Sequence, residues 1–389
     1  MNNINKHAES AKVYTAEKTY NFWIEIDKQA FIKNICIIKK FINTNTIEKK
    51  ISSLVVKADA YGHGLKEIGL LAANNINIDY FCTFNLSEAL KLRSIGTTKP
   101  ILVLAFIDQP IELALRQNID LTIGSLEVAI QANNIAKILN LKANVHLKID
   151  TGLSRLGITF DNFHEFENII NFPNLNIIGA FTHFAEADNL DTGFTKIQID
   201  RFNNAINFLR TVGCNPKFIH CANSSAIVHI QNTTDNFVRI GGLAYGLTKS
   251  KEIDNLILEK TGELPEQIFS LKTKIIQIKK IKSGEYVGYS RTFKAAQNMV
   301  IALLPIGYSD GYPRALSNKG IAYVKNIAVN IVGRIAMNMI MIDVTNVPAN
   351  IGDIVELVGN KKGILIRDIA QAANTIDYEI STRFSLKTF

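Results

Sequence analysis

The sequence has few cysteines and prolines, a single tryptophan and no long hydrophobic run. Of its 389 residues, 4 are cysteine, 8 are proline and 1 is tryptophan. No two cysteines form a C-x-x-C pair, so neither a zinc knuckle nor a thioredoxin-like site is indicated, and we expect no bound metal. So few cysteines in a long chain are typical of a reducing compartment. Since no apolar run reaches the ~18 residues that span a bilayer, we expect a cytoplasmic protein with no membrane partner.

An excess of charge of one sign is also small. Lys and Arg together number 43, against 35 Asp and Glu, which gives a net charge of +8. Such an excess can reflect a nucleic acid, a membrane surface or an anionic ligand. The densest basic segment, 279–282, alternates with apolar residues like an ordinary strand. Because no stripe of basic and aromatic residues is visible, we expect no nucleic-acid partner.

Short apolar segments alternate with amphipathic stretches of helical length over the first two thirds of the chain. This alternation is typical of parallel strands joined by crossover helices. Eight such units predict an N-terminal (β/α)₈ TIM-type barrel over residues 21–260. A doubly wound open sheet is the alternative, but no G-x-G-x-x-G follows the first strand. The predicted strands are 51–56, 79–84, 100–105, 119–124, 144–149, 177–183, 217–219 and 237–241, and the clearest predicted helices are Leu86–Ile95, Leu126–Leu139 and Gln198–Val212.

The pattern changes after about residue 260. Short segments rich in Val and Ile follow one another there, separated by Gly, Asn, Pro and Lys, and only Ile364–Ala373 has helical periodicity. This pattern predicts a mostly antiparallel β domain over residues 261–389, so the fold class is α/β, a barrel followed by a β domain. Residues 1–20 are polar and mixed in charge, and we expect them to form a flexible N-terminal arm.

Two lysines stand at the ends of predicted barrel strands, where this fold places its reactive groups. Lys57 ends the first strand and Lys148 ends the fifth. Partial burial lowers the pKa of an amine and frees it for Schiff-base chemistry. The plainer interpretation is a surface position for Lys57 and, for Lys148, an ion pair inside the barrel with Asp150 or a neighbouring carboxylate.

The ends of the last three strands carry groups that suit a phosphate. His183 follows strand six, and the loops after strands seven and eight, which often bind phosphate in this fold, hold Ser224, Gly241 and Gly242. Arg239 lies on strand eight and, because it stays protonated, must face an acceptor. A reactive lysine beside a phosphate site fits pyridoxal phosphate (PLP). It fits a sugar-phosphate aldolase or isomerase equally well, and these residues alone do not separate the two.

Seven motifs, in order along residues 20–382, resemble those of the alanine racemase family. One such motif would be a weak signal, whereas seven in the same order are specific. The family fold is a (β/α)₈ barrel followed by a β domain, in agreement with the pattern above. The motifs are Val56–Gly64 (VKADAYGHG), His146–Arg155 (HLKIDTGLSR), Thr182–Phe184 (THF), His220–Ser224 (HCANS), Val287–Tyr289 (VGY), Pro305–Arg314 (PIGYSDGYPR) and Gly333–Met337 (GRIAM).

The resemblance implies a role for each matched residue in binding PLP. Lys57 would carry the cofactor as an aldimine, and Arg239 would donate to its pyridine nitrogen. Arg155 would contact the cofactor hydroxyl and the substrate carboxylate. Lys148 matches a position that is carbamylated in several members, where the new anion pairs with Arg155. The residues at the phosphate would be Tyr61, Ser224, Gly241, Gly242 and Tyr378. The cofactor site would also include Asn223 and His183, which in the family lies between Tyr289 and Arg239.

The resemblance also implies two opposed bases, Lys57 for the proton of D-alanine and Tyr289 for that of L-alanine. Tyr289 and the N–H of Met337, which would bind the substrate carboxylate, would reach in from the partner subunit, so a homodimer is expected. The product D-alanine would supply cell-wall peptidoglycan. The alternatives are a serine or broad-spectrum racemase, a PLP-dependent decarboxylase and a non-catalytic PLP-binding module. One departure is Asn338, where the family usually has aspartate.

Overall fold

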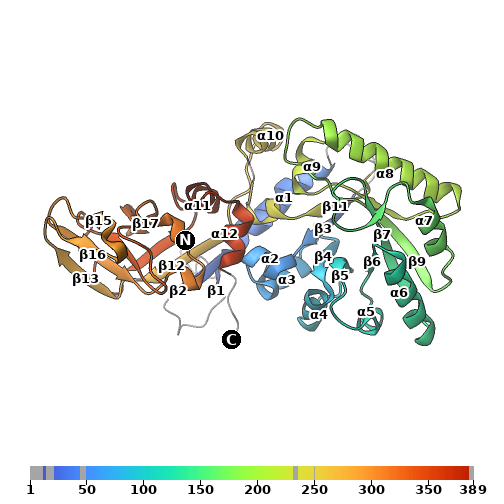
Figure 1. The fold of residues 1–389 in the computed structure, drawn as a ribbon, viewed down its shortest axis with the longest axis horizontal. Coiled ribbons are helices and arrows are strands. Elements are labelled where there is room, and N and C mark those ends of the chain that lie inside the picture. The colour runs from blue at the N-terminus through green and yellow to red at the C-terminus, as the bar shows by residue number, and fades with distance from the viewer. Residues whose placement is uncertain (1–11, 15–21, 44–49, 231–234, 249, 385–389) are drawn as a thin grey trace, which may run out of the picture.

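Eight parallel strands close into a barrel. The computed structural model describes residues 12–14, 22–43, 50–230, 235–248 and 250–384. Two parallel bridges, Leu102–Asp120 and Asn223–Arg239, join the two halves of the barrel, so the strands follow chain order around it. Each predicted segment overlaps one strand, and the predicted barrel is confirmed (Figure 1). The strands are β3 (Ile51–Val55), β4 (Tyr80–Asn85), β5 (Ile101–Phe106), β6 (Leu121–Ile123), β7 (Ala143–Asp150), β9 (Leu175–Phe181), β10 (Phe218–His220) and β11 (Phe237–Ile240), with β8 (Ile158–Thr159) beside β7.

Helices cover the outside of the barrel because each has one apolar face to bury. Helix α6, for example, packs through the small residues Ala129, Ala132 and Ala136. Helix α10 runs across residue 260, where the sequence predicts the boundary between the two domains. Within the described residues, no helix has both the length and the apolarity needed to cross a bilayer. The helices are α1 (Lys28–Asn43), α3 (Leu65–Ala73), α4 (Leu86–Ser94), α5 (Ile111–Arg116), α6 (Leu126–Ile138), α7 (Phe163–Ile170), α8 (Gly193–Thr211), α9 (Ser224–His229) and α10 (Lys251–Thr261).

The second domain is mostly antiparallel, as predicted. Its largest sheet has the strand order β1-β2-β12-β20-β17-β18, a second has the order β13-β16-β19, and β14 and β15 form a hairpin. The strands are β12 (Phe269–Lys274), β13 (Gln277–Ile281), β14 (Tyr286–Val287), β15 (Phe293–Lys294), β16 (Met299–Leu304), β17 (Ile321–Val324), β18 (Ile327–Asn330), β19 (Ile340–Asp343) and β20 (Ile354–Val358).

The start of the chain belongs to this second domain, which differs from the predicted boundaries. Strand β2 (Phe22–Asp27) pairs with β12, where Ile26 lies opposite Phe269, and β1 (Lys12–Tyr14) pairs with β2. The chain therefore crosses from the C-terminal sheet into the barrel after residue 27, and β1 lies within the segment predicted as an arm. The rest of that segment, 1–11 and 15–20, lies outside the described residues. A strand whose partner is about 240 residues away leaves no local signal in the sequence.

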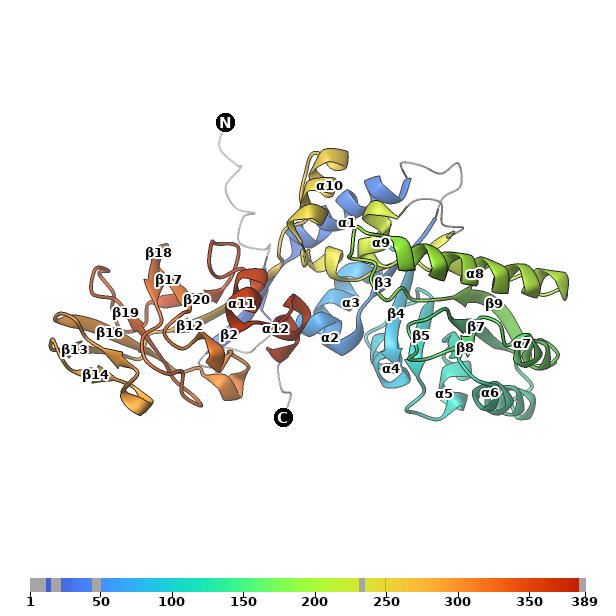
Figure 2. The ribbon, with the colours of Figure 1, turned by 45° about the horizontal axis from the view of Figure 1, so that its top comes forward.

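A short helix at the end of the chain connects the domains. Helix α11 (Ile366–Ala373) was predicted, whereas α12 (Asp377–Arg383) was not, because seven residues are too few to show a clear period. In both ribbon views α12 lies beside α2 (Lys57–Gly62), at the junction of the two domains (Figure 2). A Cβ added at Gly62 would lie 2.2 Å from the Ser381 carbonyl oxygen. The two backbones are therefore in direct contact.

We predict that Gly62→Ala destabilises the protein more than Gly213→Ala does. Both glycines have nearly the same positive φ, +80° and +82°, but nothing lies within 4 Å of a Cβ at Gly213. Both variants should lose ~1–2 kcal/mol from the left-handed backbone, and Gly62→Ala a further ~1–3 kcal/mol from steric overlap. Urea unfolding measures the two losses, and equal losses would contradict the contact between α2 and α12.

Candidate active site

A cavity of about 650 Å³ opens at the C-terminal ends of the barrel strands. Strand ends, the loops after them and helix α12 all contribute to its wall. It brings together eleven of the thirteen residues predicted for the site. They are Lys57, Tyr61, Lys148, Arg155, His183, Asn223, Ser224, Arg239, Gly241, Gly242 and Tyr378.

Lys57 begins a turn of left-handed helix. Residues 58–61 all have φ between 53° and 56°, although none of them is glycine. Each such residue costs ~1–2 kcal/mol, so the turn persists only because its surroundings hold it. The N–H of Ala60 donates to the Val56 carbonyl (2.9 Å), the ring Nδ1 of His63 contacts the carbonyls of Ala60 and Tyr61, and Glu88 accepts from Ala58 N–H (2.7 Å).

The Lys57 amine has an environment that favours its neutral form. The side chain is half-buried, and burial is the main cause that lowers the pKa of Lys57. The positive charges of Arg155 and Arg239 lower this pKa further, while the carboxylate of Glu88 opposes them. The neutral amine is the nucleophile in Schiff-base formation, so a larger fraction of Lys57 is reactive near neutral pH.

Three hydroxyl groups in the cavity wall lie close to two neighbouring glycines. A Cβ at Gly241 would lie 2.6 Å from Tyr61 Oη, and one at Gly242 would lie 2.5 Å from Tyr378 Oη. The N–H of Gly241 donates to Ser224 Oγ (2.8 Å). Hydroxyl and glycine N–H donors in such an arrangement bind phosphate oxygens. These five residues, the phosphate cradle, fit the phosphate of PLP.

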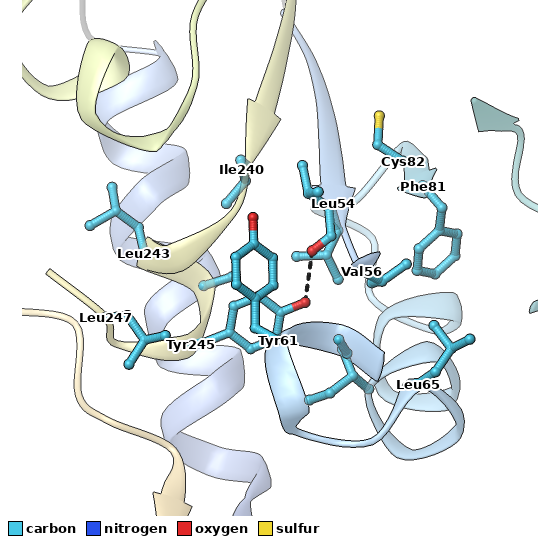
Figure 3. Packing of buried hydrophobic residues seen from close by; sticks show 14 of the residues in the cluster. Leu54, Val56, Tyr61, Leu65, Phe81, Cys82, Ile240, Leu243, Tyr245 and Leu247 are labelled. Atoms are coloured by element: carbon cyan, nitrogen blue, oxygen red, sulfur yellow. Dashed lines mark hydrogen bonds between the residues drawn. The ribbon is translucent and has the colours of Figure 1, made fainter. Parts of the chain in front are cut away.

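The cradle hydroxyls are held by aromatic packing. The ring of Tyr61 lies 5.0 Å from that of Tyr245 and 5.4 Å from that of Tyr378. Tyr245 donates to the Val55 carbonyl (2.8 Å), the dashed bond in Figure 3, and so fixes the ring against which Tyr61 packs. Burial raises the pKa values of Tyr61 and Tyr378 above the usual range. Both hydroxyls therefore remain protonated and can donate to an anion.

Asn223 shapes the start of helix α9. Its side chain accepts hydrogen bonds from the N–H groups of Ser225 and Ala226, both at 3.1 Å. This is an N-cap, which fixes the first residue of the helix. That first residue is Ser224, so the cap places its hydroxyl in the phosphate cradle.

Arg239 is buried and held by the ends of two neighbouring strands. Its Nη1 donates to the His220 carbonyl (3.0 Å) and to His220 Nδ1 (2.8 Å). Its Nη2 donates to the carbonyls of Thr182 (2.8 Å) and Cys221 (3.0 Å), and lies 3.4 Å from His183 Nδ1. Neutral acceptors thus fix the guanidinium in the cavity wall while its charge stays unpaired.

His146 also belongs to this network, although the sequence motifs predicted no role for it. His146 Nδ1 lies 2.9 Å from His220 Nε2. Because Arg239 can only donate, His220 Nδ1 must accept, and the proton of His220 must then sit on Nε2 and point to His146. A Cβ at Gly179 would lie 2.1 Å from His146 Nδ1, so this glycine makes room for the ring. The sequence did hold a signal for this position. His146 precedes Lys148 by two residues and so lies on the same face of β7.

Lys148 is the most deeply buried lysine of the cavity, with 7% of its surface exposed. Its Nζ lies 4.6 Å from the centre of the Phe181 ring. Burial, followed by the charges of Arg239 and Arg155, lowers the pKa of Lys148 to about 7. The neutral amine, the form that adds to carbon dioxide, is therefore accessible near physiological pH.

The predicted ion pair between Lys148 and Asp150 does not form. Asp150 Oδ1 instead accepts from the N–H groups of Gly152 (2.9 Å) and Ser154 (3.1 Å) in the following loop. The negative charge of Asp150 still raises the pKa of Lys148, but by less than burial and the two arginines lower it. Asp150 thus shapes the loop that carries Arg155, and Lys148 keeps no anionic partner among the described residues.

Tyr289 and Met337 lie outside this cavity. Tyr289, in the short helix η3 (Tyr289–Arg291), is 71% exposed, and Met337 is 55% exposed. Tyr289 lies between strands β14 and β15, whose hairpin stands at the end of the C-terminal domain farthest from the barrel (Figure 2). Ser309 donates to the Met337 carbonyl through its N–H (3.0 Å) and its hydroxyl (2.8 Å), and Asn338 donates to Ser309 Oγ (2.7 Å). The Met337 N–H belongs to the preceding peptide, whose Ala336 carbonyl accepts from the Tyr308 N–H (3.1 Å). The Met337 peptide is therefore fixed on the surface on both sides of the residue.

The described part of the chain holds no cluster of three or more His, Cys, Asp or Glu side chains arranged to bind a metal ion.

Comparison with known proteins identifies the family. Residues 26–249 match the family model "Alanine racemase, N-terminal domain", and residues 268–388 match "Alanine racemase, C-terminal domain". Alanine racemases of Clostridium tetani and Methanococcus maripaludis are 37% and 34% identical, over 93% of this chain and 93% and 96% of theirs.

Solved structures give the same result. Alanine racemase of Clostridium difficile 630 superposes with a TM-score of 0.86 at 31% identity, covering 94% of each chain. That of Bacillus anthracis with bound L-Ala-P superposes with a TM-score of 0.84 at 31% identity, covering 95% of this chain and 94% of the other. The two family models together match most of the barrel and of the β domain. The chain therefore belongs to the alanine racemase family of pyridoxal phosphate-dependent isomerases.

Proposed function

We propose that the protein interconverts L-alanine and D-alanine with PLP bound to Lys57. The observation that carries the proposal is the convergence, in one cavity, of the Lys57 amine, the phosphate cradle and the fixed guanidinium of Arg239. Alanine is preferred over serine as the substrate because the relatives named above are alanine racemases.

Arg239 supports a racemase over a decarboxylase. Bound PLP supplies an electron sink for the negative charge left at Cα when the Cα proton is removed. Arg239 would face the pyridine nitrogen as a donor, and because a guanidinium does not give up its proton, that nitrogen stays unprotonated. The sink is then weaker than with a carboxylate at this place, which disfavours side reactions such as transamination.

Two bases on opposite faces of the substrate would move the proton. Lys57 would serve D-alanine, and Tyr289 of a second copy of the chain would serve L-alanine. A free tyrosine has a pKa near ~10 and needs help to act as a base. His183 would give it through a hydrogen bond, because burial and the charge of Arg239 lower the pKa of His183 and favour a neutral ring.

A second copy would complete the site. Tyr289 and Met337 are exposed on the C-terminal domain and away from the cavity of their own chain, whereas Arg155 is exposed at its rim. In a homodimer, the Met337 N–H and the Arg155 guanidinium would together bind the substrate carboxylate. The fixed Met337 peptide suits this role because a donor held in place loses little entropy on binding.

We further propose a cytoplasmic role in supplying D-alanine for peptidoglycan. The four cysteines are free, and Cys82, Cys214 and Cys221 are buried, which suits a reducing compartment.

Replacing Tyr289 distinguishes the proton transfers assigned to Tyr289 and Lys57. Tyr289→Phe should lower racemisation about 10²- to 10⁴-fold, because it removes one proton-transfer group. In D₂O, exchange of the Cα hydrogen should persist with D-alanine and be lost with L-alanine. Tyr286→Phe, in the same hairpin, is the matched control and should keep full activity. Unchanged exchange with L-alanine in Tyr289→Phe would refute the assigned role.

Mixing two inactive variants tests the shared site. Lys57→Ala carries an intact Tyr289 and Tyr289→Phe carries an intact Lys57, so a mixed dimer holds one complete site of two. Because half of randomly mixed dimers are mixed, activity should return to about a quarter of the parental value after dissociation and reassociation. Absence of recovery, with mixed dimers verified by native mass spectrometry, would contradict a site shared between subunits.

Carbamylation of Lys148 should depend on pH. The neutral amine adds to carbon dioxide and releases one proton, so the carbamate should appear as pH rises through about 7, the pKa of this lysine. With ¹³C-bicarbonate, NMR should show a carbamate signal at pH 8 that weakens below pH 6 and is missing from Lys148→Ala. A Lys217→Ala control should keep the signal. If the parental protein shows no carbamate signal at pH 8, carbamylation of Lys148 is contradicted.

A further inference from the structure

Glu88 joins the ends of two barrel strands beside the cavity. Its Oε1 accepts the N–H of Ala58 (2.7 Å), the residue after Lys57, and its Oε2 accepts the N–H of Phe84 (2.8 Å), near the end of β4. Both of these residues line the cavity. The backbone of Glu88 is itself fixed, because Asn85 caps helix α4 by accepting from the Glu88 N–H (2.9 Å). One side chain therefore ties the turn after β3 to the end of the neighbouring strand.

The bond to Ala58 lies where the backbone is most strained. Ala58 is the first of the four left-handed residues and is exposed, so no packing of its own holds it. The Ala60 N–H closes the turn on the Val56 carbonyl, and His63 contacts the later carbonyls of Ala60 and Tyr61. Glu88 instead binds the N–H of Ala58, the residue directly after Lys57. Hydrogen bonds to a carboxylate are also stronger than neutral ones.

We propose that Glu88 is a positioning residue for Lys57: its carboxylate locks the first residue of the left-handed turn and thereby aims the Lys57 side chain into the cavity. This inference rests on the role proposed above for Lys57. Without the carboxylate, Ala58 can relax from its left-handed conformation, and the lysine then loses its alignment with the phosphate cradle.

The charge of Glu88 acts on Lys57 as well. Burial lowers the pKa of Lys57, Arg155 and Arg239 lower it further, and Glu88 raises it. Removing that charge should lower the pKa of Lys57 again. A side chain that served only the stability of the fold would leave this titration unchanged, so the pH dependence of the Lys57 amine distinguishes the two roles.

The chain offers a matched control in Glu165. Its Oε1 accepts the N–H of Leu126 (2.8 Å) at the start of helix α6, and its Oε2 accepts Asn162 Nδ2 (2.8 Å). Glu165 thus also accepts two hydrogen bonds, one from a backbone N–H and one from a side-chain amide, near the start of another helix. It does not line the cavity and is not among the charges that shift the pKa of Lys57.

The test compares Glu88→Gln, Glu88→Ala and Glu165→Gln with the parental full-length protein. PLP is removed and added back, its dissociation constant is measured by absorbance, and the rate of its covalent capture is measured from pH 6 to pH 10. Glu88→Ala should bind PLP about 10- to 100-fold more weakly, the range expected for losing hydrogen bonds to a charged group. Glu88→Gln, which keeps one acceptor, should bind with intermediate affinity.

In Glu88→Gln the pH at which capture reaches half its maximal rate should move to lower pH, and in Glu165→Gln it should not move. If Glu88→Gln keeps the parental dissociation constant and pH midpoint, the inference is overturned, and this holds even where Glu88→Ala does not fold. Borohydride reduction and peptide mapping of the parental protein test the role of Lys57 separately. A label on another lysine overturns both proposals, whereas a label on Lys57 with unaffected Glu88→Gln overturns only this one.

Discussion

The barrel mouth concentrates positive charge that forms no ion pair with an acidic side chain in the part of the chain that the structure describes. Arg239 and Lys148 are buried, Lys57 is half-buried beside them, and Arg155 stands at the rim. Within the described residues, no carboxylate forms an ion pair with Arg239, Lys148 or Lys57. Buried cations in such surroundings either lose their proton or require an anion. The lowered pKa values of Lys57 and Lys148 favour loss of their protons. The phosphate cradle beside Arg239 is a site where an anion can bind.

This charge has to be held in a fixed geometry, and both domains contribute to it. The barrel provides Lys57 on a strained left-handed turn, while the C-terminal domain provides Tyr378 on α12, whose backbone touches Gly62 in that same turn. The cofactor lysine, Lys57, and the phosphate donor Tyr378 therefore belong to segments that are in direct contact across the two domains. The exposed Tyr289 does not line the cavity of its own chain, which is why the proposed mechanism needs a second copy.

The sequence predicted those parts of the structure that follow from local periodicity. The eight strand ends were located well enough to bring Lys57, Lys148 and Arg239 to one edge of the barrel. The paired Gly241 and Gly242 indicated a phosphate site, since only glycine lets the cradle hydroxyls approach so closely. The individual residues did not distinguish PLP chemistry from sugar-phosphate chemistry. The seven motifs, in the order of the alanine racemase family, favoured PLP.

Features made by contacts between distant residues were missed. The pairing of β2 with β12, the position of α12 and the histidine chain from Arg239 to His146 each join segments far apart in the sequence. The left-handed turn escaped prediction for another reason. Its residues are Ala, Asp, Ala and Tyr, none of which favours that conformation, and it exists because Glu88 and His63 hold it.

The claim that anions balance this charge is tested most directly by comparing PLP with pyridoxal, which lacks the phosphate. In Lys57→Ala neither compound can bind covalently, so the two dissociation constants report the non-covalent site alone. Binding of PLP about a hundredfold or more tighter than pyridoxal, as charge-assisted hydrogen bonds to a dianion require, is the expected result. Equal affinity for the two compounds would show that the cradle and its arginine do not bind a phosphate.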